Sequence, residues 1–258
     1  MNVKVVKIGG NVVDNPELLS GFVRDFAALA GNKILVHGGG VMASELQKTL
    51  GQTPKMIEGR RVTDEDALKV VTMVYAGWCN KSVVALLQAE GCNAIGLSGA
   101  DGNVIEAVRR PAEPIDYGFV GDIYPTGVNV TLLRSLMEAG MVPVLCAINH
   151  DGKGNLLNTN ADTITSSVAS ALAGEDYVEL IYCFEKDGVL ADKDDDASVI
   201  PLITPAEYAR LKASGAVADG MIPKLDNSFK AIASGVGSVI IKHARNLLCD
   251  VQTTLRAE

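Results

Sequence analysis

Apolar positions along the chain follow two alternating spacings. Short runs rich in β-branched residues are typical of buried strands, and longer stretches with apolar residues every three or four positions are typical of amphipathic helices. The pattern predicts strands at Val3–Ile8, Lys33–Val36, Asn93–Leu97, Val142–Ala147, Asn155–Leu157, Tyr177–Cys183 and Ser238–Ile241, and a hairpin of Asn103–Val108 with Gly118–Ile123. It predicts helices at Pro16–Ala30, Val41–Leu50, Thr131–Gly140, Ala161–Ala173, Pro205–Ser214 and Gly220–Ser234, and two more within Asp64–Glu90. This alternation indicates an α/β fold with a mainly parallel sheet covered on both faces.

Composition and charge exclude several classes of function. The 258 residues carry 31 acidic and 23 basic side chains, a net charge of −8, which argues against non-specific nucleic-acid binding and against an anionic membrane surface. We expect no membrane span, because we find no apolar run approaching the roughly 18 residues that one needs. We also expect no signal peptide, because the opening MNVKVVKIGG already resembles a strand. The five cysteines form no C-x-x-C pair, which favours a reducing, cytoplasmic setting over structural zinc or disulfides.

Two predicted strands end in glycines. Gly9 and Gly10 follow Lys7 and the first strand, and Gly38-Gly39-Gly40 follow the second. Such turns suit an anion held by backbone N–H groups, the oxyanion loop of a lipase-like hydrolase, or a plain turn that needs positive φ. The hydrolase interpretation lacks its nucleophile elbow, because Gly96–Ala100 departs from G-x-S-x-G at the last position, and the P-loop and Rossmann patterns are also absent. A glycine-lined anion site at the carboxyl edge of the sheet remains.

Charged and amide side chains recur at three further predicted helix starts. Arg60 and Arg61 precede Thr63, and arginine suits bidentate capture of a carboxylate. Asp162 lies in a first turn after several asparagines, where an acid also simply suits the helix dipole. Lys224 lies in a first turn that disfavours a cation, and a residue placed against local preference indicates function. We interpret the acidic run Asp192–Asp196 as a solvated loop and predict no protein-held metal.

The ordered set of these segments resembles the amino acid kinase family, and within it the branch that phosphorylates N-acetyl-L-glutamate. The matching segments are Lys7–Gly10, His37–Gly40, Gly59–Thr63, Gly96–Gly99, Leu157–Asp162, Asp187–Leu190 and Asp219–Lys224. The resemblance implies an open three-layer αβα sandwich and a single domain over residues 1–258. Its N-terminal lobe, about 1–170, would bind acyl-glutamate, and its C-terminal lobe, about 171–258, would bind ATP. It further implies a homodimer and formation of an acyl phosphate on the γ-carboxylate, in arginine biosynthesis.

The resemblance also implies roles for individual residues. Lys7 and Lys224 would stabilise charge on the transferring phosphoryl group, and Asp162 would orient both lysines. Backbone N–H groups of Gly9, Gly10, Gly39 and Gly40 would bind phosphoryl oxygens and the γ-carboxylate, Arg61 would bind the α-carboxylate, and Asn158 would bind the amide region. The nucleotide site would be lined by Glu185, Lys186, Asp187, Gly188, Val189, Leu190, Ala216, Val217 and Ala218. Mg²⁺ would be held mainly by the ATP phosphates and water.

A carboxylate is already a competent nucleophile, so we interpret His37, His150 and His243 as structural or surface residues.

Several positions depart from the family pattern. Many relatives have lysine where this chain has Ala100. Before Asp187 relatives often have Thr-Asp or Ser-Asp, whereas this chain has Cys183-Phe184-Glu185-Lys186. The run Cys146–His150 also differs from the usual serine-containing run. N-succinyl-L-glutamate is therefore an alternative substrate, whose extra carboxylate would need a cation such as Lys55 or Arg60. The sequence also leaves open another amino acid kinase, such as a glutamate or carbamate kinase, and a non-catalytic amino-acid sensor. We expect no arginine feedback, because no helix precedes the first strand here.

Overall fold

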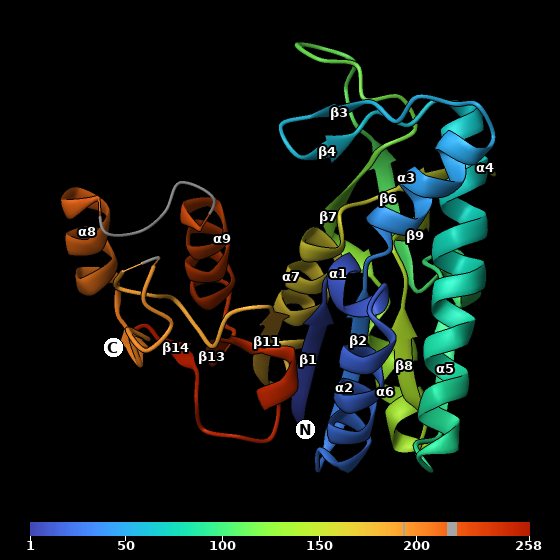
Figure 1. Ribbon diagram of the computed structural model, residues 1–258. Helices are drawn as coiled ribbons and strands as arrows, with labels where there is room; N and C mark the ends of the chain where they lie inside the picture. The colour runs from blue at the N-terminus through green and yellow to red at the C-terminus, as the bar shows by residue number, and fades with distance from the viewer. Residues whose placement is uncertain (193, 216–220) are drawn as a thin grey trace.

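A computed structural model describes residues 1–192, 194–215 and 221–258, and its main feature is an eight-stranded sheet (Figure 1). The strand order is β12-β14-β13-β11-β1-β2-β8-β5, and all neighbours from β13 to β5 are parallel. At one edge β14 and β12 run the opposite way. The bounds are β1 Asn2–Ile8, β2 Asn32–His37, β5 Ala94–Leu97, β8 Val142–Leu145, β11 Tyr177–Phe184, β12 Leu202–Ile203, β13 Ser238–His243 and β14 Thr253–Leu255.

Helices cover both faces of this sheet. Helices α2 and α5 pack together on one face, and α7 packs with α6 and α9 on the other. The bounds are α1 Gly10–Val13, α2 Pro16–Ala28, α3 Gly40–Thr49, α4 Glu65–Thr72, α5 Asn80–Ala89, α6 Val130–Glu138, α7 Ala161–Leu172, α8 Pro205–Ser214 and α9 Ile222–Ala233. Short 3₁₀ turns occupy Asp101–Asn103 and Ala244–Asn246. The predicted α/β sandwich with a mainly parallel sheet is therefore confirmed.

A smaller β layer lies beyond the carboxyl ends of the central strands. It contains a four-stranded sheet in the order β10-β9-β6-β7 and a two-stranded hairpin of β3 and β4, which Figure 1 shows at the top of the molecule. The bounds are β3 Met56–Ile57, β4 Arg60–Arg61, β6 Ile105–Arg109, β7 Gly121–Val128, β9 Ile148–His150 and β10 Leu156–Asn158. The predicted hairpin of β6 with β7 is confirmed. This layer brings its own side chains over the glycine turns that end β1 and β2.

The segment predicted as two helices is one continuous helical run. A π-helical stretch, Met73–Cys79, joins α4 to α5 without a break. The resulting helix, Glu65–Ala89, is long and apolar enough by length and composition alone to span a membrane, a test that a core helix of a globular protein also passes. In the fold it packs as a core helix, burying Val70, Val74, Val83 and Leu87. Only 44% of its most apolar window is buried within the chain.

Candidate active site

The glycine turns of β1 and β2 lie side by side at the carboxyl edge of the sheet. Ile8 is in register with His37, and the Gly38 N–H donates to the Ile8 carbonyl at 3.2 Å. Gly9 precedes α1 and Gly39 precedes α3, and neither offers a side-chain cap. A Cβ on Gly10 would lie 3.3 Å from the Gly40 nitrogen. The two turns thus present free helix-start N–H groups to a common space, which favours an anion there.

Gly39 packs tightly against the π-helical stretch. A Cβ at this position would lie 3.0 Å from both the Cys79 Sγ and the Tyr75 Cδ1 atoms. The thiol of Cys79 is buried, and burial raises its pKa to about 12, so it acts as a packing group. Without side chains, Gly39 and Gly40 both pack close to this stretch and line the cavity.

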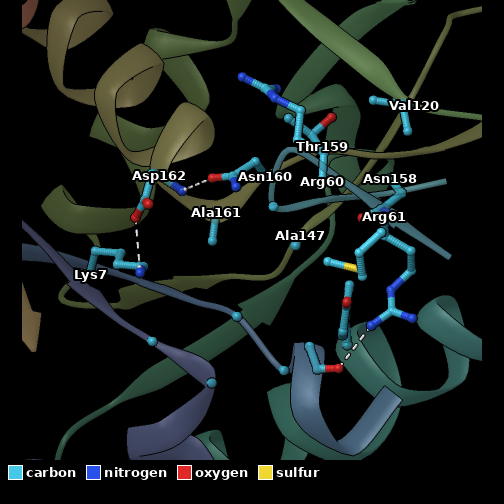
Figure 2. A pocket seen from close by; sticks show the side chains of 18 residues that line it. Lys7, Arg60, Arg61, Val120, Ala147, Asn158, Thr159, Asn160, Ala161 and Asp162 are labelled. Carbon is cyan, nitrogen blue, oxygen red and sulfur yellow. Dashed lines mark hydrogen bonds and ion pairs between the residues drawn. The ribbon is translucent and has the colours of Figure 1, made fainter. Parts of the chain in front are cut away.

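Lys7 and Asp162 form an ion pair at the centre of the site. Their Nζ and Oδ1 atoms are 2.9 Å apart, and Lys7 is only 7% exposed (Figure 2). Lys7 lies near the carboxyl end of β1, and Asp162 is in the first turn of α7, where the Asn160 side chain accepts a hydrogen bond from the Asp162 N–H at 2.7 Å. The predicted partnership of Lys7 with Asp162 is present in the structure.

Lys224 approaches the same pair from the other end of the chain. It lies in the first turn of α9, and its Nζ atom is 3.9 Å from the centroid of the Phe184 ring. Burial lowers the pKa of Lys224, Asp162 raises it, and Lys7 lowers it further. Lys224, Asp162 and Phe184 also line a small shared cavity of about 20 Å³ with Tyr182. The two lysines predicted from opposite ends of the chain therefore meet near one carboxylate.

Arg61 lies at the far side of the same cavity. It is held in β4 and buried, and its guanidinium donates to the Gly40 carbonyl at 2.9 Å, to Ser44 Oγ at 2.7 Å and to the Gln47 side chain. Its Nε atom has no hydrogen-bond partner among the described residues. These contacts fix the guanidinium against α3, so its planar face is ordered before any ligand arrives.

Asn158 reaches the cavity from β10 in the smaller β layer. Its side-chain amide donates to Thr63 Oγ1 at 3.0 Å, and Thr63 is itself fully buried. The Thr63 N–H donates to the Tyr117 carbonyl and its carbonyl accepts from the Phe119 N–H, which fixes the loop before α4. Asn158 is therefore oriented by a buried contact at the wall of the cavity.

One cavity of about 190 Å³ joins most of the predicted residues (Figure 2). Cationic side chains, a carboxylate and bare backbone meet in it, which suits a small anionic molecule. Of the predicted residues, those lining it are Lys7, Gly9, Gly10, Gly39, Gly40, Arg61, Asn158 and Asp162. In the part of the chain that the structure describes, no group of three or more His, Cys, Asp or Glu side chains is arranged to hold a metal ion.

The predicted nucleotide residues lie in two different environments. Glu185, Lys186 and Asp187 line a second cavity of about 230 Å³ with His243 and Arg245. Gly188, Val189 and Leu190 instead pack inward: a Cβ on Gly188 would lie 2.6 Å from Thr253 Oγ1, the Val189 N–H donates to that oxygen at 2.8 Å, and Leu190 bridges to Val199. These three residues would therefore contribute to a nucleotide site by fixing the conformation of the loop after β11. Ala216, Val217 and Ala218 lie outside the described residues.

His37 is a structural residue. It is fully buried, its Nδ1 lies 2.7 Å from the Gly38 carbonyl, and its Nε2 lies 3.1 Å from the Asn80 side-chain nitrogen. Burial lowers its pKa to about 4, so the ring is neutral near pH 7. A neutral ring that donates from Nδ1 and accepts at Nε2 satisfies both contacts.

Sequence reasoning missed Tyr75 and Phe184. Tyr75 lines the main cavity, with its hydroxyl 3.9 Å from where a Cβ on Gly40 would lie. Burial raises the pKa of its phenol, and the adjacent Arg61 opposes this. A tyrosine within an apolar helix is typical of a core position, so its sequence carries no distinguishing signal. Phe184 was visible only as a departure from the family pattern.

Comparison with known proteins supports one assignment. Residues 2–243 match the amino acid kinase family. The chain is 53% identical to the acetylglutamate kinase of Cytophaga hutchinsonii, covering 95% of this chain and 92% of that protein. It is 52% identical to the acetylglutamate kinase of Bacteroides fragilis, covering 98% and 96%. The solved structure of smu.665 from Streptococcus mutans superposes with a TM-score of 0.80 at 28% identity, covering 99% of both chains. With its glycine turns and its lysine–aspartate pair at the expected edge of the sheet, this chain belongs to the amino acid kinase family.

Proposed function

We propose that this protein is an acetylglutamate kinase, which uses ATP to phosphorylate the γ-carboxylate of N-acetyl-L-glutamate in arginine biosynthesis. The observation that carries the proposal is the Lys7–Asp162 ion pair beside two bare glycine turns. The relatives that match nearly the whole of this chain are named acetylglutamate kinase. The products would be N-acetyl-L-glutamyl 5-phosphate and ADP.

Phosphoryl transfer to a carboxylate requires that the two substrates are positioned and that the charge on the transferring group is stabilised. A γ-carboxylate oxygen attacks the γ-phosphorus of ATP, an oxygen–phosphorus bond forms, and the bond to the β–γ bridging oxygen breaks, so that ADP leaves with the electron pair. No proton moves, so no general base is needed. Lys7 and Lys224 would stabilise the charge on the transferring group, and Asp162 would hold both ammonium groups near it.

The two substrates would occupy opposite lobes. The acyl-amino acid would lie in the cavity of the N-terminal lobe, about 1–170, with its α-carboxylate toward Arg61 and its amide toward Asn158. ATP would extend over the C-terminal lobe, about 171–258, toward the cavity lined by Glu185, Lys186 and Asp187. Mg²⁺ would be held mainly by the phosphates and water, and it would neutralise charge on the nucleotide.

We further infer a cytoplasmic homodimer. The long helix Glu65–Ala89 leaves large apolar side chains exposed, including Met73 and Trp78, which are 54% and 67% exposed. Together with Met42, Leu46 and Val74 they line a mainly apolar groove between α3 and the helix, which Glu45 and Thr49 also line. A single exposed helix face suits packing on a second copy about a two-fold axis, because such an interface needs only one surface.

The decisive experiment is a coupled ADP-release assay with Mg-ATP. We expect turnover with N-acetyl-L-glutamate and far less with free L-glutamate. Lys7→Ala should lower kcat roughly 10²–10³-fold, because it removes charge stabilisation used in the transition state. Lys4→Ala is the matched control, since Lys4 is on the same strand and donates to the Ala30 carbonyl at 3.1 Å. Near-normal turnover of the Lys7 variant would refute its role, and no turnover of the wild type with any acyl-glutamate would refute the function.

N-succinyl-L-glutamate is the second candidate substrate. Arg60 lines the cavity next to Arg61, and among the described residues it forms no ion pair. An acyl arm with its own carboxylate would meet this cation. Offering both acyl-glutamates in the same assay distinguishes them, and an Arg60→Ala variant should then weaken only the succinyl substrate.

A further inference from the structure

The Phe184 ring lies close to both lysines of the site. Its ring centroid lies 3.9 Å from the Lys224 Nζ atom and 5.4 Å from the Lys7 Nζ atom. The ring belongs to the last residue of β11, the strand next to β1, and it stacks on Tyr182 at 5.9 Å. One aromatic ring therefore serves two ammonium groups from opposite ends of the chain.

The electrostatics of this arrangement explain why a ring is useful there. Two ammonium groups in one half-buried site repel each other, and the carboxylates of Asp162 and Glu185 offset only part of the cost of burial and repulsion, since the pKa of Lys224 remains lowered. The negative face of an aromatic ring attracts cations within about 6 Å, most strongly where water is excluded. The ring adds this attraction without adding a full negative charge, which would repel the phosphates of a nucleotide.

We propose that Phe184 is a positioning residue that holds Lys7 and Lys224 together, charged and correctly spaced for the transferring phosphoryl group. The proposal deepens the proposed kinase function and rests on it. It also assigns a role to a position where the sequence departs from the family pattern. The ring acts through the lysines, so its loss should affect the chemical step more than binding of the acyl-amino acid at the Arg61 end of the cavity.

The test replaces the ring while keeping an apolar side chain. Phe184→Leu should lower kcat about tenfold and leave the KM for the acyl-glutamate within about twofold, since one cation–π contact in a desolvated site contributes about that factor. Phe184→Tyr, which restores an aromatic face, should recover most of the kcat. Phe229→Leu is the packing control, because Phe229 stacks on Tyr208 within the same lobe, whereas both lysines lie over Phe184.

The pH profile separates a positioning role from a packing role. Among the described residues, the charged groups that act on Lys224 are Asp162, Lys7 and Glu185, and all three remain in the variant. Losing the ring removes a contact that favours the ammonium form of Lys224. The decrease of kcat at high pH should therefore begin at a lower pH in Phe184→Leu and at the wild-type pH in Phe229→Leu.

The outcomes distinguish the inference from the function beneath it. If the wild type turns over an acyl-glutamate but Phe184→Leu keeps its kcat and its alkaline limb, the role of Phe184 is wrong and the kinase function stands. If Phe229→Leu loses as much kcat as Phe184→Leu, with the same pH profile, the effect is packing and the inference is overturned. If the wild type turns over no acyl-glutamate, the failure lies with the proposed function.

Discussion

At the scale of single residues, the site is formed by a few charged side chains that come from distant parts of the chain and line one cavity. Lys7, Arg61 and Asp162 stood out because each carries charge beside a glycine turn or a helix start, and the structure brings all three to one cavity. Tyr75 and Phe184 reach the site through tertiary approach of elements distant in sequence, and nothing local marks them. Spacing along the chain also does not show that Lys7 and Lys224 lie close together. That expectation came from the family resemblance.

Tyr75 gives the first prediction at this scale. Its hydroxyl faces the cavity beside Arg61 and stays protonated because burial raises its pKa, so it can donate to an anionic substrate group. Tyr75→Phe should raise the KM for the acyl-glutamate roughly tenfold with little change in kcat, since a hydrogen bond to a charged group contributes about that factor. Tyr177→Phe is the control, because Tyr177 begins β11 and the site lies near the other end of that strand. This variant should leave the KM unchanged. An unchanged KM in the Tyr75 variant would show that the hydroxyl does not contact substrate.

At the scale of elements, the periodic strands and helices were predictable and the smallest ones were not. Strands β1, β2 and β11 and helices α2, α3 and α7 follow the predicted ranges within a few residues. The strands β3, β4, β9, β12 and β14 are two or three residues long, too short for a period-two pattern to appear. The π-helical stretch also escaped prediction, because its residues differ in no obvious way from those of an α-helix.

The packing of the π-helical stretch against the start of α3 leads to a prediction about Gly39. Gly39→Ala should lower stability by about 1–3 kcal/mol, because its Cβ would press on the Tyr75 ring and the Cys79 sulfur. Gly21→Ala is the matched control: Gly21 lies inside α2 with nothing within 4 Å of a new Cβ, so alanine should add roughly 0.5–1 kcal/mol of stability. Urea unfolding of both variants measures the difference. Equal stabilities for the two would mean that α3 shifts freely against the long helix.

At the scale of the whole molecule, one continuous sheet joins the parts that would bind the two substrates. The β1–β11 ladder runs over seven residue pairs, and it brings Lys7 beside the strand that carries Phe184. Sequence alone predicted the sandwich because alternating strands and helices leave few competing arrangements. It could not order the strands, since the crossovers that place β11 beside β1 depend on contacts between distant segments.

The proposed homodimer belongs to this scale. Trp78→Glu places a charge on the exposed apolar face of the long helix, so it should shift the protein from twice the chain mass of 27.1 kDa toward a single chain. Size-exclusion chromatography with light scattering would measure the mass. Lys69→Glu, on a polar and exposed part of the same helix, should leave it unchanged. A monomeric wild type, or a Trp78 variant that remains a dimer, would contradict this interface.

The β1–β11 ladder has a consequence for how the protein is made. β1 leaves the ribosome first and can pair early with β2, but its other edge must wait until Tyr177–Phe184 has been translated. An unpaired apolar strand edge is a template for another chain. The nascent protein therefore carries this open edge until Tyr177–Phe184 has been made, and until then the edge can pair with a strand of a neighbouring nascent chain.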